Sequence, residues 1–280
     1  MPFPCYNVLM KMHTLILITI LSMFFTACGV KEPERREEQR QVKIAVIDTG
    51  FSGRAIPAEN VLEGKNYLDE TLSTEDTYGH GTAVASVILQ NCSDALLVPL
   101  VSNVFENGKI LQVENDRFAQ IIRDAVDVYE CDIINISAGL ILDKDSVYDA
   151  IQYAEEMGVL VVASVGNDYQ PDQPCKYYPA AYETVLAVGS VDKEGKQISE
   201  FSQRGEWVNL YVCGEDVTIS TLSGNTRISE GTSYSAAKVS AYAAQMILQA
   251  EKYSTPEEIR KMLLHQTQEM ESGENYILKR

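Results

Sequence analysis

The chain has few basic residues for its length. Its 280 residues include 23 Lys and Arg against 40 Asp and Glu, so the formal net charge is -17. The Lys and Arg residues form no extended basic stretch that could follow a phosphate backbone. A nucleic acid is therefore not expected as a partner. No internal repeat is present either, and a chain of this length can bury a full core as one α/β domain with short appendages.

The cysteines lack the spacing of a zinc site. Beyond residue 28 the chain has Cys92, Cys131, Cys175 and Cys213, and none of them forms a C-x-x-C pair. An even number of cysteines in an oxidising compartment is compatible with disulfides, whose pairing the sequence does not choose. Four buried free thiols fit equally well, so both alternatives stay open.

The first 28 residues have the character of a secretion signal. Lys11 and His13 precede an apolar run at 14–27, which is short for a bilayer span and ends in small residues before Cys28. The string Phe-Thr-Ala-Cys-Gly at 25–29 resembles the bacterial lipoprotein signal, which implies that Cys28 is lipidated and becomes the new N-terminus. An uncleaved membrane anchor is the alternative, and both place the rest of the chain outside the cytoplasm, held at a membrane.

The segment at 29–41 is charged and has no apolar periodicity, so we expect a solvated tether followed by one folded domain at 42–280. Buried β-rich runs lie at 42–47, 95–101, 132–136, 159–163 and 184–188. Helical apolar stripes separate them, from Phe118 to Tyr129 and from Val147 to Ala154, the latter closed by Gly158. This alternation predicts an α/β fold with a mostly parallel central sheet covered by helices on both faces, and with ligands bound at the carboxyl ends of the strands.

A further helix is expected near the end of the chain. The string Thr-Pro-Glu-Glu at 255–258 is a capping box with proline at the first helical position. We expect this helix to continue to about Gln268 and to pack on the outside of the domain.

Three residues in short glycine-containing strings carry the chemistry. Asp48 follows a buried strand in Asp-Thr-Gly at 48–50, His80 lies in Gly-His-Gly-Thr at 79–82, and Ser233 ends Gly-Thr-Ser at 231–233 before a helix rich in small residues. A carboxylate, an imidazole and a hydroxyl are what activation of a serine nucleophile requires. His80 is the only one of three histidines in a glycine-bounded turn within the domain.

Each residue also has a simpler interpretation. Asp48 could start a turn, His80 could be structural, and Ser233 could be a helix N-cap. Asp-Thr-Gly after an apolar run also resembles the aspartic peptidases, but the chain has no second Asp-Thr-Gly or Asp-Ser-Gly string to complete their pair of carboxylates.

Taken in order, these strings resemble the three motifs of the subtilisin-type serine peptidases, the subtilases, over roughly 42–249. The resemblance implies a three-layer subtilisin-like fold and a catalytic triad of Asp48, His80 and Ser233. A fourth string at 161–167 is similar to the family's oxyanion segment, which implies that the side-chain amide of Asn167 helps to hold the tetrahedral oxygen.

The resemblance extends to substrate binding. Ser137, Ala138 and Gly139 are similar to the family strand whose backbone pairs with an extended peptide. Tyr177 stands where the family usually has a glycine on the floor of the first specificity pocket. We expect a small residue before the cut bond, whereas Asp168 at the rim could instead accept a basic one.

Some residues depart from the family pattern. Tyr234 replaces the usual Met after the serine, the calcium loop is shortened to 90–94, and the family's propeptide has no room between Cys28 and 42. We therefore expect no metal or other cofactor. The main hypothesis is a membrane-tethered, extracytoplasmic serine endopeptidase acting on peptides or proteins, and the rival is a related module that binds exported peptides without cutting them.

Overall fold

The computed structural model describes residues 41–106, 108–137, 143–250, 254–269 and 276–278. The expected signal with Cys28 and nearly all of the tether lie outside these residues, as do Ala138 and Gly139. In the described part of the chain, no helix is both long enough and apolar enough to cross a membrane.

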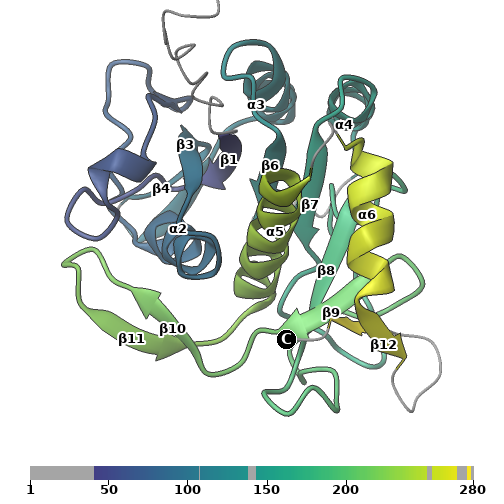
Figure 1. Cartoon of the computed structure of the whole chain (residues 1–280). Coiled ribbons are helices and arrows are strands. Elements are labelled where there is room, and N and C mark those ends of the chain that lie inside the picture. The colour runs from purple at the N-terminus through teal and green to yellow at the C-terminus, as the bar shows by residue number, and fades with distance from the viewer. Residues whose placement is uncertain (1–40, 107, 138–142, 251–253, 270–275, 279–280) are drawn as a thin grey trace, which may run out of the picture. The chain divides into compact units, whose positions relative to one another are not determined.

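The described chain folds into strands and helices, which alternate in part of the chain and elsewhere give way to runs of consecutive strands (Figure 1). The helices are the short 3-10 helix η1 (Ala58–Asn60), α2 (His80–Asn91), α3 (Asn115–Asp127), α4 (Asp145–Glu156), α5 (Thr232–Gln249) and α6 (Pro256–His265). The strands are β1 (Val42–Asp48), β2 (Lys65–Asn66), β3 (Ala95–Val101), β4 (Asn103–Glu106), β5 (Lys109–Gln112), β6 (Ile133–Ile136), β7 (Leu160–Ser164), β8 (Leu186–Val191), β9 (Leu210–Cys213), β10 (Val217–Ser220), β11 (Thr226–Ser229), β12 (Thr267–Glu269) and β13 (Tyr276–Leu278).

Nine strands form one sheet in the order β12-β13-β9-β8-β7-β6-β1-β3-β2. All neighbouring pairs are parallel except β12 with β13. β1 pairs with β3 on one side and with β6 on the other, so its residues are surrounded by strands and their side chains are buried. The expected mostly parallel sheet is confirmed.

Helices cover both faces of the sheet. Alternate residues of β1 face opposite sides: Ile44 and Val46 belong to the core shared with α2 and α5, whereas Ala45 and Ile47 belong to the core shared with α3 and α4. In Figure 1, α2, α5 and α6 lie in front of the sheet. The three-layer α/β architecture follows directly from strands that are apolar on both faces.

Two boundaries differ from the sequence expectation. α6 ends at His265, not near Gln268, because Thr267–Glu269 pairs with β13 and becomes a strand. β8 begins at Leu186, not at Thr184, because the Val185 N-H donates to the Tyr182 carbonyl in a preceding turn. The hairpins β4-β5 and β10-β11 were not expected from the sequence, since their strands are only four residues long and only β10 among them has buried residues.

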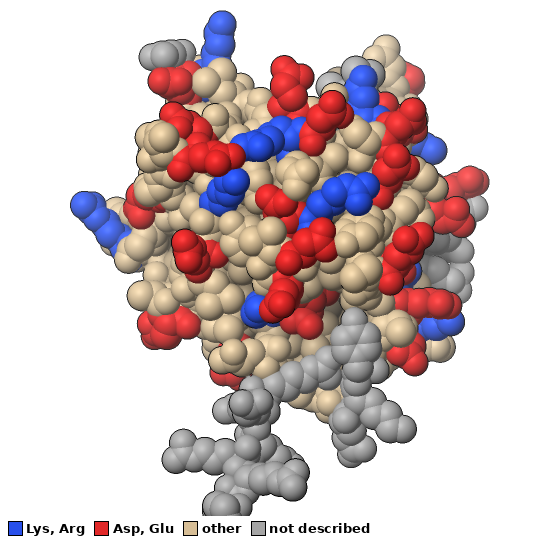
Figure 2. All heavy atoms as spheres, turned by 90° about the horizontal axis from the view of Figure 1, so that it is seen from above, with Lys and Arg blue, Asp and Glu red and all other residues tan. Residues whose placement is uncertain are grey.

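The described surface carries mixed charges. On the face shown in Figure 2, acidic side chains are scattered among basic ones, and no continuous basic patch forms. This face therefore offers no electrostatic track for a nucleic acid backbone.

The capping box of α6 gives a test of local stability. Thr255 accepts the Glu258 N-H, while Glu258 accepts the Thr255 N-H in return. We expect Thr255→Ala to lower the free energy of unfolding by about 1 kcal/mol, because one helix N-H loses its partner. Thr255→Ser keeps the oxygen and should stay close to the parent protein in denaturant titrations. Equal loss in both variants would assign the effect to the methyl group and contradict the capping argument.

Candidate active site

The first two sequence motifs lie against each other at the carboxyl end of β1. Gly50 has a φ of 98°, and a Cβ on Gly81 would lie 2.4 Å from the Gly50 carbonyl oxygen. Only glycine permits this backbone approach. The Thr49 hydroxyl oxygen also accepts the Gly81 N-H at 2.9 Å. The start of α2 is thereby fixed on the turn that follows Asp48.

Asp48, His80 and Ser233 form a continuous chain of polar contacts. His80 Nδ1 lies 2.8 and 2.9 Å from the two carboxylate oxygens of Asp48, so it donates its proton to that side. His80 Nε2 lies 3.2 Å from Ser233 Oγ. The Asp48 side chain is 1% exposed and that of His80 is 30% exposed, so the contact chain leads from the core to a surface that a substrate can reach.

The surroundings of His80 favour its protonated form. Burial by itself lowers the pKa of the imidazole, but the charge of Asp48, its hydrogen bond and the charge of Asp76 oppose this. The net effect is a His80 pKa above its ordinary value. An imidazole held in this way can take a proton from a neighbouring hydroxyl and keep it while a reaction proceeds.

Asp76 is a positioning residue that the sequence analysis missed. It is 4% exposed. One of its oxygens accepts the Tyr78 and Gly79 N-H groups at 2.9 and 2.8 Å, and the other accepts the Thr82 N-H at 2.9 Å and the Thr82 hydroxyl at 2.6 Å. Asp76 thus closes the loop around His80. The signal was an Asp four residues before the histidine, a pattern too common in loops to be informative alone.

Asn167 is oriented by the start of α5. Its Oδ1 accepts both the N-H and the hydroxyl of Thr232, each at 2.8 Å. A backbone N-H can only donate, so the atom that faces it must be the amide oxygen, and Nδ2 points elsewhere. Ser233 follows Thr232 in the first turn of α5, where backbone N-H groups have no partner within the helix. The Asn167 amide and these backbone N-H groups thus lie at the same end of α5 as Ser233.

A buried polar network links Ser233 to β6. The Ser240 hydroxyl donates to Asn135 Oδ1 at 3.0 Å, and Asn135 Nδ2 donates to Ser137 Oγ at 3.0 Å. The Ser137 hydroxyl donates to the Ser233 carbonyl at 3.3 Å. Ser240 and Asn135 are both 0% exposed, so these contacts hold α5 in register with β6. The sequence analysis did not single out Asn135 or Ser240.

Tyr177 narrows the cavity beside Asn167. This cavity, of about 380 Å³, is lined by Ser137, Ser164, Gly166, Asn167, Asp168 and Tyr177. A Cβ on Gly166 would lie 2.6 Å from the Tyr177 ring, so the ring packs directly on the Gly166 backbone. The Tyr177 hydroxyl donates to Asp168 Oδ2 at 2.6 Å, and Gln203 donates to Asp168 Oδ1 at 3.0 Å.

The ionisation of Asp168 and Tyr177 is coupled through that hydrogen bond. It lowers the pKa of Asp168 and raises the pKa of Tyr177 to about 12. Both Asp168 oxygens are engaged, which leaves this carboxylate less available to a basic substrate residue than the sequence suggested.

The cysteines and acidic residues provide no further site in the described part of the chain. Cys92, Cys131, Cys175 and Cys213 are all free thiols, so no disulfide links them in this structure. The described residues contain no cluster of three or more His, Cys, Asp or Glu that could hold a metal ion. α2 ends at Asn91 and β3 starts at Ala95, which leaves a short connection where the sequence predicted a shortened loop.

The class of the site follows from a buried carboxylate, an imidazole and a hydroxyl that lie in line at the carboxyl end of a central parallel strand. Serine peptidases use this arrangement. The comparisons with known proteins agree. The model of the subtilase family matches residues 39–278. The "Major intracellular serine protease" of Bacillus subtilis (strain 168) is 34% identical over 210 residues, or 69% of this chain and 65% of that protein.

A second relative is the "Thermophilic serine proteinase" of Bacillus sp. (strain AK1). It is 32% identical over 218 residues, which is 74% of this chain and 52% of that protein. The chain therefore spans about half to two thirds of the length of these two relatives.

Solved structures show the same fold. A cold-adapted subtilisin-like serine proteinase has a TM-score of 0.73 at 23% identity, over 85% of this chain and 88% of that one. A lanthipeptide protease has a TM-score of 0.73 at 22% identity, over 84% of each chain. This chain belongs to the subtilase family.

The role of Asp76 can be measured directly at His80. We expect Asp76→Asn to lower the pKa of His80, because an anion that stabilises the imidazolium is removed. Both Asp76 oxygens accept hydrogen bonds, so the NH2 group of the introduced Asn would face donors with which it cannot bond. The free energy of unfolding should therefore fall by about 1–3 kcal/mol. The His80 ring resonances, followed by NMR against pH, give the pKa.

Asp69→Asn is the matched control, since Asp69 lies in the same connection, is exposed, and its carboxylate accepts hydrogen bonds from the neighbouring Thr71. Its substitution changes net charge equally and should leave the His80 pKa near the parent value. An unchanged His80 pKa in Asp76→Asn would rule out the electrostatic part of this account.

Proposed function

We propose that this chain is a serine endopeptidase that hydrolyses peptide bonds through an acyl-enzyme. The observation that carries the proposal is the unbroken contact chain from Asp48 through His80 to Ser233. Membership of the subtilase family supports it. In this proposal His80 removes the Ser233 proton, and the Ser233 oxygen attacks the carbonyl carbon of the substrate.

His80 then returns the proton to the departing amine. As the carbon-nitrogen bond breaks, the first product leaves with a new amino terminus, and the acyl group stays on Ser233. A water molecule, deprotonated by His80, attacks the ester and releases the second product. Asp48 keeps Nδ1 protonated throughout and stabilises the imidazolium in both halves of the reaction.

The oxyanion is assigned to Asn167 Nδ2 and the Ser233 N-H. Thr232 fixes the amide of Asn167 from its oxygen side, so the donor is oriented before substrate arrives. Preorganised donors of this kind stabilise the charge that develops in the transition state and need no rearrangement during the reaction. The positive end of the α5 dipole acts in the same direction.

The cavity of Tyr177 is assigned to the side chain before the cut bond. The packing of the Tyr177 ring on Gly166 leaves little depth, which favours a small side chain. Ser137, with Ala138 and Gly139, is proposed to pair with the backbone of an extended substrate.

The membrane attachment is proposed from the sequence alone. The apolar run at 14–27, the lipoprotein-like string that ends in Cys28 and the charged segment at 29–41 support a lipid-held, extracytoplasmic enzyme. Metabolic labelling with a fatty-acid analogue, lost in Cys28→Ser, tests this part separately from catalysis.

Reaction with a fluorophosphonate tests the activity. These probes modify a serine only when a neighbouring base activates it, so we expect stoichiometric labelling of the parent protein. Ser233→Ala should remove the label, and Ser235→Ala, on the same helix but bonded to the Val212 carbonyl, should keep it. Absence of labelling in a folded protein would instead favour the module that binds peptides without cutting them.

The Tyr177 cavity predicts cleavage preference. We expect peptides with Ala before the cut bond to be cleaved with a kcat/KM at least about tenfold above that for Phe, since the ring occupies the room a large side chain needs. Tyr177→Ala should reduce or reverse this ratio. Tyr177→Phe, which keeps the ring and loses the hydroxyl, should preserve it. Faster cleavage after Phe than after Ala by the parent protein would refute the assignment.

A further inference from the structure

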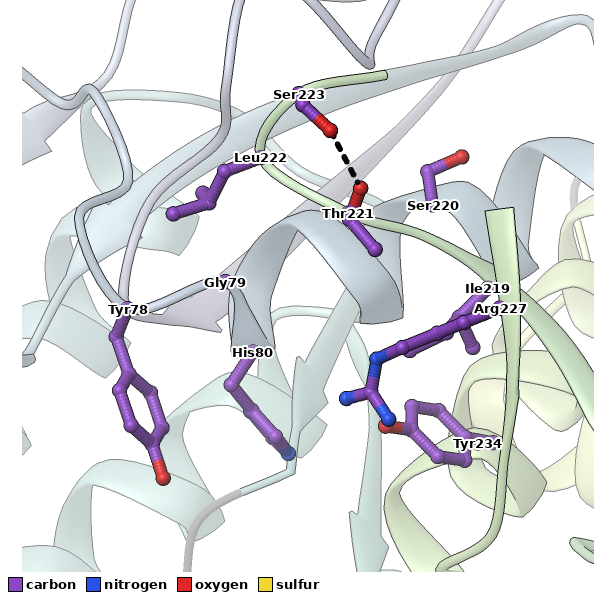
Figure 3. A pocket seen from close by; sticks show the side chains of 10 residues that line it. All are labelled: Tyr78, Gly79, His80, Ile219, Ser220, Thr221, Leu222, Ser223, Arg227 and Tyr234. Carbon is purple, nitrogen blue, oxygen red and sulfur yellow. Dashed lines mark hydrogen bonds between the residues drawn. The ribbon is translucent and has the colours of Figure 1, made fainter. Parts of the chain in front are cut away.

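A second cavity adjoins His80 and shares no lining residue with the Tyr177 cavity. It has a volume of about 490 Å³ and is lined by residues 78–80, residues 219–223, Arg227 and Tyr234. It thus lies between the start of α2, the β10-β11 hairpin and the start of α5, and Figure 3 shows its side chains. The reactions assigned above leave the hairpin residues without a role.

Arg227 brings an uncompensated positive charge to this cavity. None of the residues that line the cavity is Asp or Glu, although the chain as a whole carries 40 of them. Among the described residues, Arg227 forms no ion pair of 4.0 Å or less, and its guanidinium makes a long hydrogen bond, from Nη1 to Ser229 Oγ at 3.5 Å. Most of its guanidinium donors are therefore free for a ligand.

Tyr234 lies between Arg227 and the proposed nucleophile Ser233. It directly follows Ser233 and is 5% exposed. Its hydroxyl lies 3.1 Å from Ser229 Oγ, the same atom that Arg227 approaches. In Figure 3 the guanidinium projects into the cavity between the His80 imidazole and the Tyr234 ring. A guanidinium presents two parallel donors that match the two oxygens of a carboxylate.

The chemistry of proton transfer identifies which part of a substrate enters this cavity. His80 Nε2 must reach the nitrogen of the departing amine, so the segment after the cut bond leaves past His80. The acyl side lies toward Ser137 and the Tyr177 cavity. The cavity with Arg227 therefore faces the first residues after the bond.

We propose that Arg227 selects substrates that carry a carboxylate just after the cut bond. This inference rests on the proposed peptidase function. The carboxylate can belong to an Asp or Glu side chain in the first two positions after the bond, or to the free C-terminus of a short departing peptide. Both present the same anion to the guanidinium.

Four fluorogenic peptides separate these sources. They share one sequence with Ala before the bond and differ in Asp or Asn after it and in a free or amidated C-terminus. If Arg227 binds the side-chain carboxylate, we expect the Asp peptide to have a kcat/KM about five- to tenfold above that of its Asn counterpart. If the terminus is read, the free acid should exceed the amide by a similar factor. Equal kcat/KM for all four peptides would overturn the inference.

Variants assign the preference to Arg227. In Arg227→Gln we expect the acid-to-neutral ratio to fall to about one, and in Arg227→Glu to fall below one. Lys196→Gln is the control, because Lys196 is exposed and lies outside both cavities. Its substitution removes one positive charge, as Arg227→Gln does. It should leave every ratio unchanged. An unaltered ratio in Arg227→Gln, or an equal loss in Lys196→Gln, would show that the preference does not come from this cavity.

Binding to Ser233→Ala makes the inference independent of turnover. Fluorescence anisotropy of the same peptides should give a Kd several-fold lower for the acid forms, and Arg227→Gln in this background should remove the difference. If the parent protein neither labels nor cleaves but the Kd difference persists, the peptidase function fails and the carboxylate site stands. If cleavage is efficient but neither kcat/KM nor Kd depends on the carboxylate, the peptidase function stands and the carboxylate site fails.

Discussion

The Asp48 carboxylate is buried at the end of the central strand β1. A carboxylate in such a place costs several kcal/mol unless donors surround it. The Thr49 N-H donates to it at 2.8 Å, and His80 Nδ1 faces both of its oxygens. The imidazole therefore helps to stabilise the buried Asp48 carboxylate in the folded protein. Its orientation is set before any substrate arrives.

The hydroxyl reaches the imidazole through the packing of two helices. His80 begins α2 and Ser233 lies in the first turn of α5, and both helices pack on the same face of the sheet. Small buried residues of α5, among them Ala236, Ala237 and Ser240, allow close approach to that sheet. The Ser240–Asn135 hydrogen bond then fixes α5 against β6. The 3.2 Å contact between Nε2 and Oγ is thus maintained by core packing remote from the site.

The two cavities beside Ser233 differ in chemistry. In one, Tyr177 and Gln203 already satisfy the Asp168 carboxylate, and an aromatic ring limits the depth. In the other, Arg227 is held by its strand with most of its donors unengaged. The two proposals above follow from this difference: selection by size before the cut bond, and selection by charge after it.

The sequence determined the fold class and singled out the three side chains that meet in the contact chain, because both depend on local signals. Apolar runs that alternate with amphipathic stripes require a parallel sheet with two helical layers, and glycines beside Asp48, His80 and Ser233 mark the tight backbone turns that present them. The start of the strand expected at 184–188 and the end of the last helix were misplaced, because a turn hydrogen bond shortens the one and pairing with the following strand β13 ends the other. The sequence also left open whether the four cysteines form disulfides, because this depends on which of them lie close together in the folded chain; all four are free thiols in the structure.

Only the tertiary structure decided which polar residues support the site. Asp76 and Asn135 have no sequence signature, since what makes them important is the set of donors that other segments bring to them. The same holds for Arg227, an exposed residue of a short hairpin, whose position beside His80 depends on how that hairpin packs against α2. Local sequence fixes what a side chain can do, whereas the free energy of packing the whole chain fixes what it meets.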